Sequence, residues 1–174
     1  LPQEPPQTKA RQKEMNAAVP LDLLCKTWHM AGRLGEDYHA TDLLTDILGG
    51  NNSSRLYQQL VKEQKLFVHL DCYHFGSSDP SLLTIEGKLV EGISMEKAEQ
   101  ALQIEIDKIC KEGPSEQELQ KVKNKTESLI AFEDMSVMSR ASSLAYYELL
   151  GDAAWMNTEL QQYANVTTAQ IKKV

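Results

Sequence analysis

Apolar positions in the middle of the chain change their period twice, and each change predicts a boundary between elements. An amphipathic helix is predicted where apolar residues recur every three or four positions, at Ala40, Leu43, Leu44, Ile47 and Leu48. Gly49 and Gly50 follow, and we expect a glycine in the left-handed conformation to end this helix. The Asn and Ser residues at 51–54 are types that cap a second helix, whose apolar stripe is Leu56, Tyr57, Leu60 and Val61.

Three segments have the period of two that is typical of strands, over residues 16–31, 66–75 and 82–91. The turn-forming residues 76–81 lie between the last two segments and predict an antiparallel hairpin. Apolar residues occupy both faces of 16–31, so we expect that strand to be covered on both sides for part of its length. Pro20 lacks a donor N–H, which places it at a sheet edge or at the beginning of the strand.

Helical patterns fill the second half of the chain. One begins after Ser94 and ends at Gly113-Pro114, and Ser115 with Glu118 forms a capping box for the next. That run continues to Leu150 without Gly or Pro, so we expect a break near 132–136. The expected inward positions are Leu119, Val122, Leu129 and Ile130, then Met138, Ala141, Leu144, Ala145 and Leu149. Two short helices, around 155–164 and from Thr168, complete the pattern.

Three strands and about six helices, partly segregated along the chain, predict an α+β fold of two layers, an antiparallel-rich sheet packed against helices. With 174 residues the chain can form one domain with a substantial core. Residues 1–14 are rich in Pro, Gln and Lys and are interpreted as a linker, and residues 15–174 as a single domain. The chain begins with Leu1 and its last helix is short, so we interpret the domain as truncated at its C-terminal end.

Composition narrows the possible partners. A net charge of −7 without a basic stripe argues against nucleic acid. No apolar run approaches the roughly 20 residues of a membrane span. The three cysteines, Cys25, Cys72 and Cys110, are far apart and lie in apolar patterns, so we expect buried free thiols.

The segment LLTDILGG-(x)2-SSRLYQQL, residues 43–60, carries a resemblance to a known family. It resembles the signature of the second, non-zinc domain of insulinase/pitrilysin-type (inverzincin) zinc metallopeptidases, the processing-peptidase-like branch in particular. The sequences EPPQT at 4–8 and VTTAQI at 166–171 are similar to the ends of that domain. The resemblance implies a companion domain that holds zinc, facing this one across a chamber that admits peptides.

The four histidines give no zinc motif of their own. Inverzincins bind zinc through H-x-x-E-H on a helix plus a downstream glutamate, because both histidines must share one helix face. That spacing is absent at each histidine, His29, His39, His69 and His74. We therefore expect no metal site, cofactor or catalytic residue in this chain. His39 is expected to be solvated on the polar side of its helix, and His69 and His74 to lie on opposite strand faces.

Two other sets of residues were weighed as sites. Cys72 and His74 share a strand face beside Asp71 and could form a nucleophile with a base, but Leu66, Val68 and Leu70 are expected on that face too, so an ordinary strand face is favoured. In the family that this sequence resembles, the second, non-zinc domain usually contributes an arginine and a tyrosine, seven residues apart, that reach toward the substrate. Aligning S-S-R-L-Y places those positions at Val61 and Val68, and neither side chain can donate a hydrogen bond. An oxyanion-stabilising role needs such donors, so these valines argue against it. Arg55 is interpreted as a surface residue at a helix start and Tyr57 as a packing residue.

Two functions follow from the resemblance. The favoured one is the non-catalytic half of a zinc-dependent metalloendopeptidase, inactive alone, that helps to form the peptide-binding chamber with a companion in the same chain or another. The alternative is an inactive structural or regulatory partner subunit of a zinc peptidase, which the two valines favour. A stand-alone binding domain would share only the fold.

Overall fold

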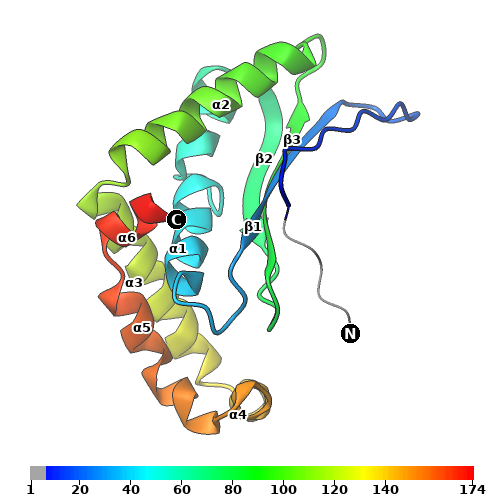
Figure 1. The fold of residues 1–174 in the computed structure, drawn as a ribbon. Coiled ribbons are helices and arrows are strands. Elements are labelled where there is room, and N and C mark those ends of the chain that lie inside the picture. Colours follow the sequence, from blue (N-terminus) through cyan, green and yellow to red (C-terminus); the bar gives the residue numbers. More distant parts are fainter. Residues whose placement is uncertain (1–6) are drawn as a thin grey trace.

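A three-stranded antiparallel sheet with helices on one face makes up the fold in the computed structural model, which describes residues 7–174 (Figure 1). The strands are β1 Leu23–Met30, β2 Phe67–His74 and β3 Ser81–Leu89, in the order β1-β3-β2. Both pairings are antiparallel, so the predicted hairpin and the α+β class are confirmed. β1 is an edge strand that begins after Pro20, as expected, but it is shorter than the predicted 16–31.

The helices follow the predicted order with two differences in type: one segment is a π-helix, and a 3₁₀-helix forms at the start of the helix predicted around 155–164. Residues 49–56, which we call the glycine corner, are followed by a π-helix, η1 Tyr57–Glu63. The spacing of apolar residues does not distinguish a π-helix from an α-helix. The other helical elements are α1 Tyr38–Leu48, α2 Met95–Glu112, α3 Glu116–Glu133, α4 Val137–Leu150, η2 Ala153–Thr158, α5 Glu159–Asn165 and α6 Thr168–Lys173.

Side-chain caps set the helix boundaries that the sequence predicts. The Ser94 hydroxyl accepts a hydrogen bond from the Lys97 N–H at the start of α2. At the start of α3 the capping box forms in both directions between Ser115 and Glu118. The predicted break lies between α3 and α4, where the Ser136 hydroxyl accepts from the Ser139 N–H.

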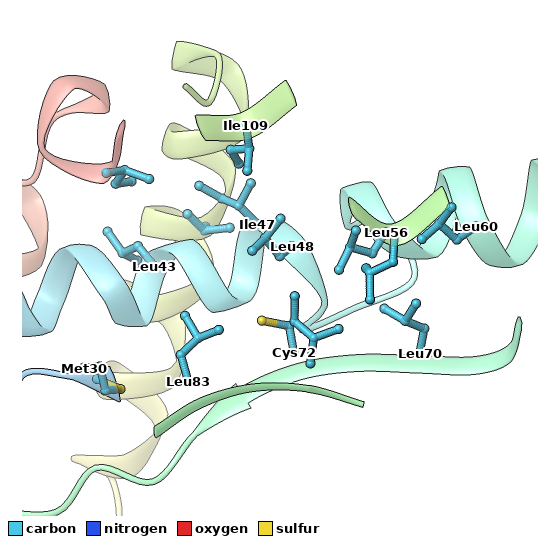
Figure 2. Close-up of a cluster of buried hydrophobic side chains, with 14 of the residues drawn as sticks. Met30, Leu43, Ile47, Leu48, Leu56, Leu60, Leu70, Cys72, Leu83 and Ile109 are labelled. Atoms are coloured by element: carbon cyan, nitrogen blue, oxygen red, sulfur yellow. The ribbon is translucent and has the colours of Figure 1, made fainter. Parts of the chain in front are cut away.

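The core lies between the sheet and the helices, and α1 is at its centre. α1 packs against β2 on one side and contacts α3 on the other, so the helices are two deep at this point (Figure 1). In Figure 2, Leu83 of β3 and Cys72 of β2 lie on the sheet side of α1 and Ile47 lies on the side of Ile109; all four belong to one buried cluster. Leu56 and Leu60, from the glycine corner and η1, are fully buried beside Leu70.

Gly49 is required at the end of α1 because the backbone of β2 lies very close to it, not because it adopts a left-handed conformation. Its φ is −141°, so the predicted left-handed conformation is wrong. A Cβ at Gly49 would lie 2.3 Å from the backbone nitrogen of Cys72, closer than real contacts allow. The absent side chain therefore lets the end of α1 approach β2.

Only one face of the sheet is covered by helices within the described residues, which corrects the expectation for the first strand. Leu24 and Met30 of β1 are buried, but Leu23 and Cys25 point to the other face and are exposed. Cys110 is exposed too, so of the three free thiols only Cys72 is buried as predicted.

A β-bulge changes the face that Val68 occupies. The pairing of β2 with β3 shifts between Phe67 and His69, so Phe67 takes the inward place and is 2% exposed. Val68 is 56% exposed instead of sharing the inner face with Leu70 as predicted.

The inward face predicted for the long helical run holds in α3 but not in α4. Leu119 and Val122 are buried and Ile130 packs partly buried against the core, but Leu129 is 52% exposed. α4 has no buried residue at all, and its expected inward positions, Met138, Ala141, Leu144, Ala145 and Leu149, are exposed. The break before α4 redirects the helix, so its apolar positions no longer point at this core.

The predicted linker falls partly outside the described residues, which exclude 1–6. Residues 7–14 are exposed and belong to no helix or strand. The linker role and the boundary at residue 15 remain predictions.

We predict that Lys65→Gly stabilises the protein. Lys65 joins η1 to β2 with φ at +53°, a conformation that costs a residue with a side chain about 1–2 kcal/mol. Glycine removes that cost but loses about 0.5–1 kcal/mol because its unfolded chain is freer, so the net gain should be up to about 1.5 kcal/mol. Denaturant unfolding measures it. Lys62→Gly, at an exposed position within η1, is the control and should lower stability. A loss of stability in Lys65→Gly would contradict the conclusion that the positive φ of Lys65 destabilises the protein.

Candidate functional site

The histidines do not assemble a metal centre in the part of the chain that the structure describes. No group of three or more His, Cys, Asp or Glu side chains within residues 7–174 is arranged to hold a metal ion. His29 and His69 are exposed on the uncovered sheet face, whereas His39 and His74 are partly buried among polar partners. None of the helices in this range has the length and apolarity needed to cross a bilayer.

The most developed polar cluster surrounds Arg33, in the loop between β1 and α1. Its guanidinium is 8% exposed and donates to Glu159 at 2.5 Å and to the Tyr147 hydroxyl at 3.1 Å. His39 Nε2 lies 3.3 Å from the Glu159 carboxylate and 3.4 Å from Arg33. The Tyr38 ring stacks under the guanidinium, with 4.6 Å between the charged carbon and the ring centroid. His39 is therefore held in this cluster, and the expectation that it is solvated is wrong.

The charges in this cluster satisfy one another. Burial opposes ionisation of Glu159, but hydrogen bonds from His39 and Arg33 outweigh it and lower the pKa of the carboxyl to about 2. Burial also opposes the charge on Arg33, yet the hydrogen bond to Glu159 raises the pKa of the guanidinium. Burial, with the charge of Asp42 next, raises the pKa of the Tyr38 hydroxyl to about 12. An ion pair locked in this way is suited to holding elements together rather than to moving protons.

A second polar cluster continues from the first along α1. Asp42 accepts hydrogen bonds from the Tyr163 hydroxyl at 2.5 Å and lies 2.7 Å from His74 Nε2. Burial opposes its charge, but these two hydrogen bonds outweigh burial and lower the pKa of Asp42. Tyr38 makes edge contacts with both His39 and His74, which joins the two clusters. Together they connect α1 to the end of β2 and to α4 and α5.

A cavity of about 370 Å³ opens beside Arg33. Leu34, Gly35 and Trp155 line it together with Tyr147 and Glu159. Arg33 and Glu159 are paired with each other, and the further polar side chains that line this cavity include Glu36 and Gln162.

Cys72 and His74 do share the inner face of β2, as strand alternation predicts, but their surroundings oppose a nucleophilic role. Cys72 is 3% exposed, and burial together with the charge of Asp71 raises the pKa of its thiol. A reactive cysteine needs a lowered pKa and access to solvent. Asp71 accepts a hydrogen bond from the Cys72 N–H. The ordinary strand face is the better description.

Arg55 has a structural task that the sequence reading missed. Its guanidinium forms two hydrogen bonds to the Glu118 carboxylate, at 2.5 and 2.7 Å, and a third to the Gly113 carbonyl at 3.2 Å. The hydrogen bond from Arg55 is the main reason that the pKa of Glu118 falls to about 2. Arg55 thus fixes the glycine corner to the turn between α2 and α3 rather than standing free on the surface.

Val61 and Val68 occupy different surroundings. Val61 lies in η1, partly buried against the core, while Val68 projects from the bulge in β2. Neither offers a polar atom beyond its backbone.

The Arg33 cluster was not predicted from the sequence. Its main partners are 126 residues apart, and no local spacing marks Arg33 or Glu159 among the 18 basic and 25 acidic residues. Tyr147, Glu159 and Tyr163 all lie in the segment whose path was predicted least well.

Comparison with known proteins gives a consistent result. The family model described as the peptidase M16 inactive domain matches residues 1–126. No curated protein matches. A protease from Helicobacter pylori is 20% identical with a TM-score of 0.83, over 91% of this chain and 38% of that chain. The inactive peptidase domain of a candidate zinc protease from Bordetella parapertussis is 20% identical with a TM-score of 0.78, over 87% of this chain and 82% of that one. A peptidase M16 inactive domain from Pseudomonas fluorescens is 19% identical with a TM-score of 0.73, over 87% of this chain and 36% of that one. At these identities the structures establish a shared fold, and this chain spans well under half the length of the Helicobacter protein.

We predict that Glu159→Gln reduces the loss of stability in acid. The folded-state pKa of about 2 lies below the ordinary value of 4.5, so the charged carboxylate stabilises the protein above about pH 4.5. That stabilisation is lost as the pH falls from 4.5 to 2, and the glutamine variant lacks it throughout. At pH 7 the variant should be less stable by about 3 kcal/mol, because Arg33 loses its buried counter-charge.

Urea unfolding between pH 7 and pH 2 tests this. Glu133→Gln, at an exposed position on α3, serves as the control and should follow the unaltered protein. Parallel pH profiles for Glu159→Gln and the unaltered protein would contradict the prediction.

Proposed function

The chain belongs to the family of the peptidase M16 inactive domain, and from this membership we propose that it is the non-catalytic half of a zinc-dependent metalloendopeptidase. The observation that carries the proposal is the family match over residues 1–126, which confirms the resemblance read from the glycine corner. The zinc and the catalytic groups would belong to a companion domain or subunit. The donors within residues 7–174 do not fit a zinc site, because the histidines are dispersed or engaged by Asp42 and Glu159.

The proposed role of this half is to form part of the wall of a chamber that holds a peptide. Within the described residues, the sheet leaves one face without helices and has two edge strands, β1 and β2 (Figure 1). Edge strands present unpaired backbone N–H and C=O groups to which an extended peptide can add as a further strand. The uncovered face mixes apolar and charged side chains, with Cys25, Glu86 and Asp71 in one row across the sheet.

Two features support a companion domain. The chain covers 38% of the Helicobacter pylori protease and 36% of the Pseudomonas fluorescens protein, so both contain substantial further sequence. The family description itself calls the domain inactive, which implies that the chemistry lies elsewhere. The linker at 1–14 and the single domain at 15–174 fit this organisation as part of the proposal.

The alternative is an inactive structural or regulatory partner subunit of a zinc peptidase. Val61 and Val68 favour it, since they replace the arginine and tyrosine that the resemblance leads one to expect. The two candidates differ in whether a peptide is bound beside this domain during cleavage.

Zinc content of the native protein tests the proposal. We expect about one tightly held zinc per assembly that contains this domain, by elemental analysis after exhaustive buffer exchange, together with chelator-sensitive cleavage of an unstructured peptide. The chain of 174 residues alone should hold no stoichiometric zinc. A native protein without zinc or cleavage would overturn the proposal in favour of the inactive partner.

We further predict that the two valines contribute no donor to the reaction. In the native protein, Val61→Ala and Val68→Ala should each leave kcat within about threefold, whereas losing an oxyanion donor costs about 10²–10³-fold. Val61→Ala should lower stability, because Val61 packs against the core, while Val68→Ala should not. Steady-state cleavage of a fluorogenic peptide measures kcat, and a loss beyond tenfold in a folded variant would show a direct role.

A further inference from the structure

The helix α4 turns its polar side inward and its apolar side outward. The apolar stripe of α4, as we call it, recurs every three or four residues and consists of Val137, Met138, Ala141, Leu144, Ala145 and Leu149. All six are exposed, with Val137 at 83%, Met138 at 76% and Leu149 at 84%. The side facing the rest of the chain carries Ser139, Ser143 and Tyr147, with Leu150 at the end of the helix. This orientation is the reverse of what burial within a single domain would select.

Hydrogen bonds fix α4 in this orientation. Arg33 donates to the Tyr147 hydroxyl at 3.1 Å, and the neighbouring Tyr146 hydroxyl donates to the Gly76 carbonyl at 3.4 Å. Glu148, the ionisable side chain on the outward arc, accepts a hydrogen bond from the Ala153 N–H at 3.2 Å. Rotating the helix to bury its apolar stripe would break the contact with the buried Arg33 cluster. The exposure is therefore set by the fold.

The apolar surface continues beyond α4. Phe132 and Met135, which immediately precede the helix, are 71% and 79% exposed. Figure 1 places α4 at one end of the molecule, at the opposite end of the helical layer from α2. Contiguous exposed apolar side chains of this kind mark interaction sites on soluble proteins. Ala141 and Ala145 lie between Met138 and Leu149, so the centre of the stripe admits close approach of another backbone.

We propose that the apolar stripe of α4 docks against an apolar surface of the companion zinc-bearing domain; this inference rests on the proposed function. Several solved relatives contain enough further sequence for such a companion domain, since this chain covers only 36–38% of their length. A second copy is disfavoured, because each copy carries a net charge of −7.

Site-specific photo-cross-linking in the native protein tests the proposal. The variants Met138→p-benzoylphenylalanine and Leu149→p-benzoylphenylalanine place the probe on the stripe, and Arg140→p-benzoylphenylalanine places it on the same helix outside the stripe. We expect cross-links from positions 138 and 149 to the region that carries H-x-x-E-H, whether in the same polypeptide or a co-purifying one. The probe at position 140 should form no cross-link to that region. Cross-links to a second copy of this domain, to its own surfaces, or none at all, would overturn the inference.

Zinc measured in the same preparations distinguishes a failure of the docking inference from a failure of the proposed function. A zinc-containing, active protein with cross-links elsewhere would overturn the docking inference alone. A zinc-free, inactive protein would overturn the proposed function, whatever the cross-links show. Each cross-linked variant is compared with the unaltered protein by thermal unfolding, and both stripe variants should remain folded because positions 138 and 149 are exposed.

Discussion

The buried ion pair of Arg33 and Glu159 is the constraint on which the arrangement of the second half of the chain depends. It joins the loop after β1 to the first residue of α5, across 126 residues of sequence. A charge as buried as Arg33, at 8% exposure, must keep its partner, because an unpaired buried charge is strongly unfavourable. Tyr147 and His39 complete the coordination of the pair. Once the pair forms, the positions of α4 and α5 relative to α1 follow.

The same constraint explains why the ionisable groups of these two polar clusters are poorly suited to acid–base chemistry. Arg33, Glu159, Asp42 and His74 are each engaged in a hydrogen bond or ion pair between elements. Their carboxyl pKa values are lowered, which keeps them charged and paired. A catalytic acid or base needs a pKa near the working pH and access to a substrate. These groups instead hold α1, β2, α4 and α5 in place relative to one another.

The sequence predicted the elements well because their signals are local. Caps at Ser94 and Ser115 and the change of period at Leu66 lie within a few residues of the boundaries they set. The same holds for the hairpin and for the break before α4. Where a second segment decides, prediction failed: the bulge that turns Val68 outward depends on β3, and the use of Gly49 depends on Cys72 of β2.

The sequence by itself determined the fold class, the order of elements, the family signature at residues 43–60 and the absence of an inverzincin motif. Tertiary structure alone decided the Arg33 cluster, the anchoring of Arg55 by Glu118 and the outward orientation of α4. The periodicity of α4 reports that one face is apolar, but it carries no information on whether that face meets this core or another molecule. The polar contact at Tyr147 turns that face away from this core, because it holds the helix from its polar side.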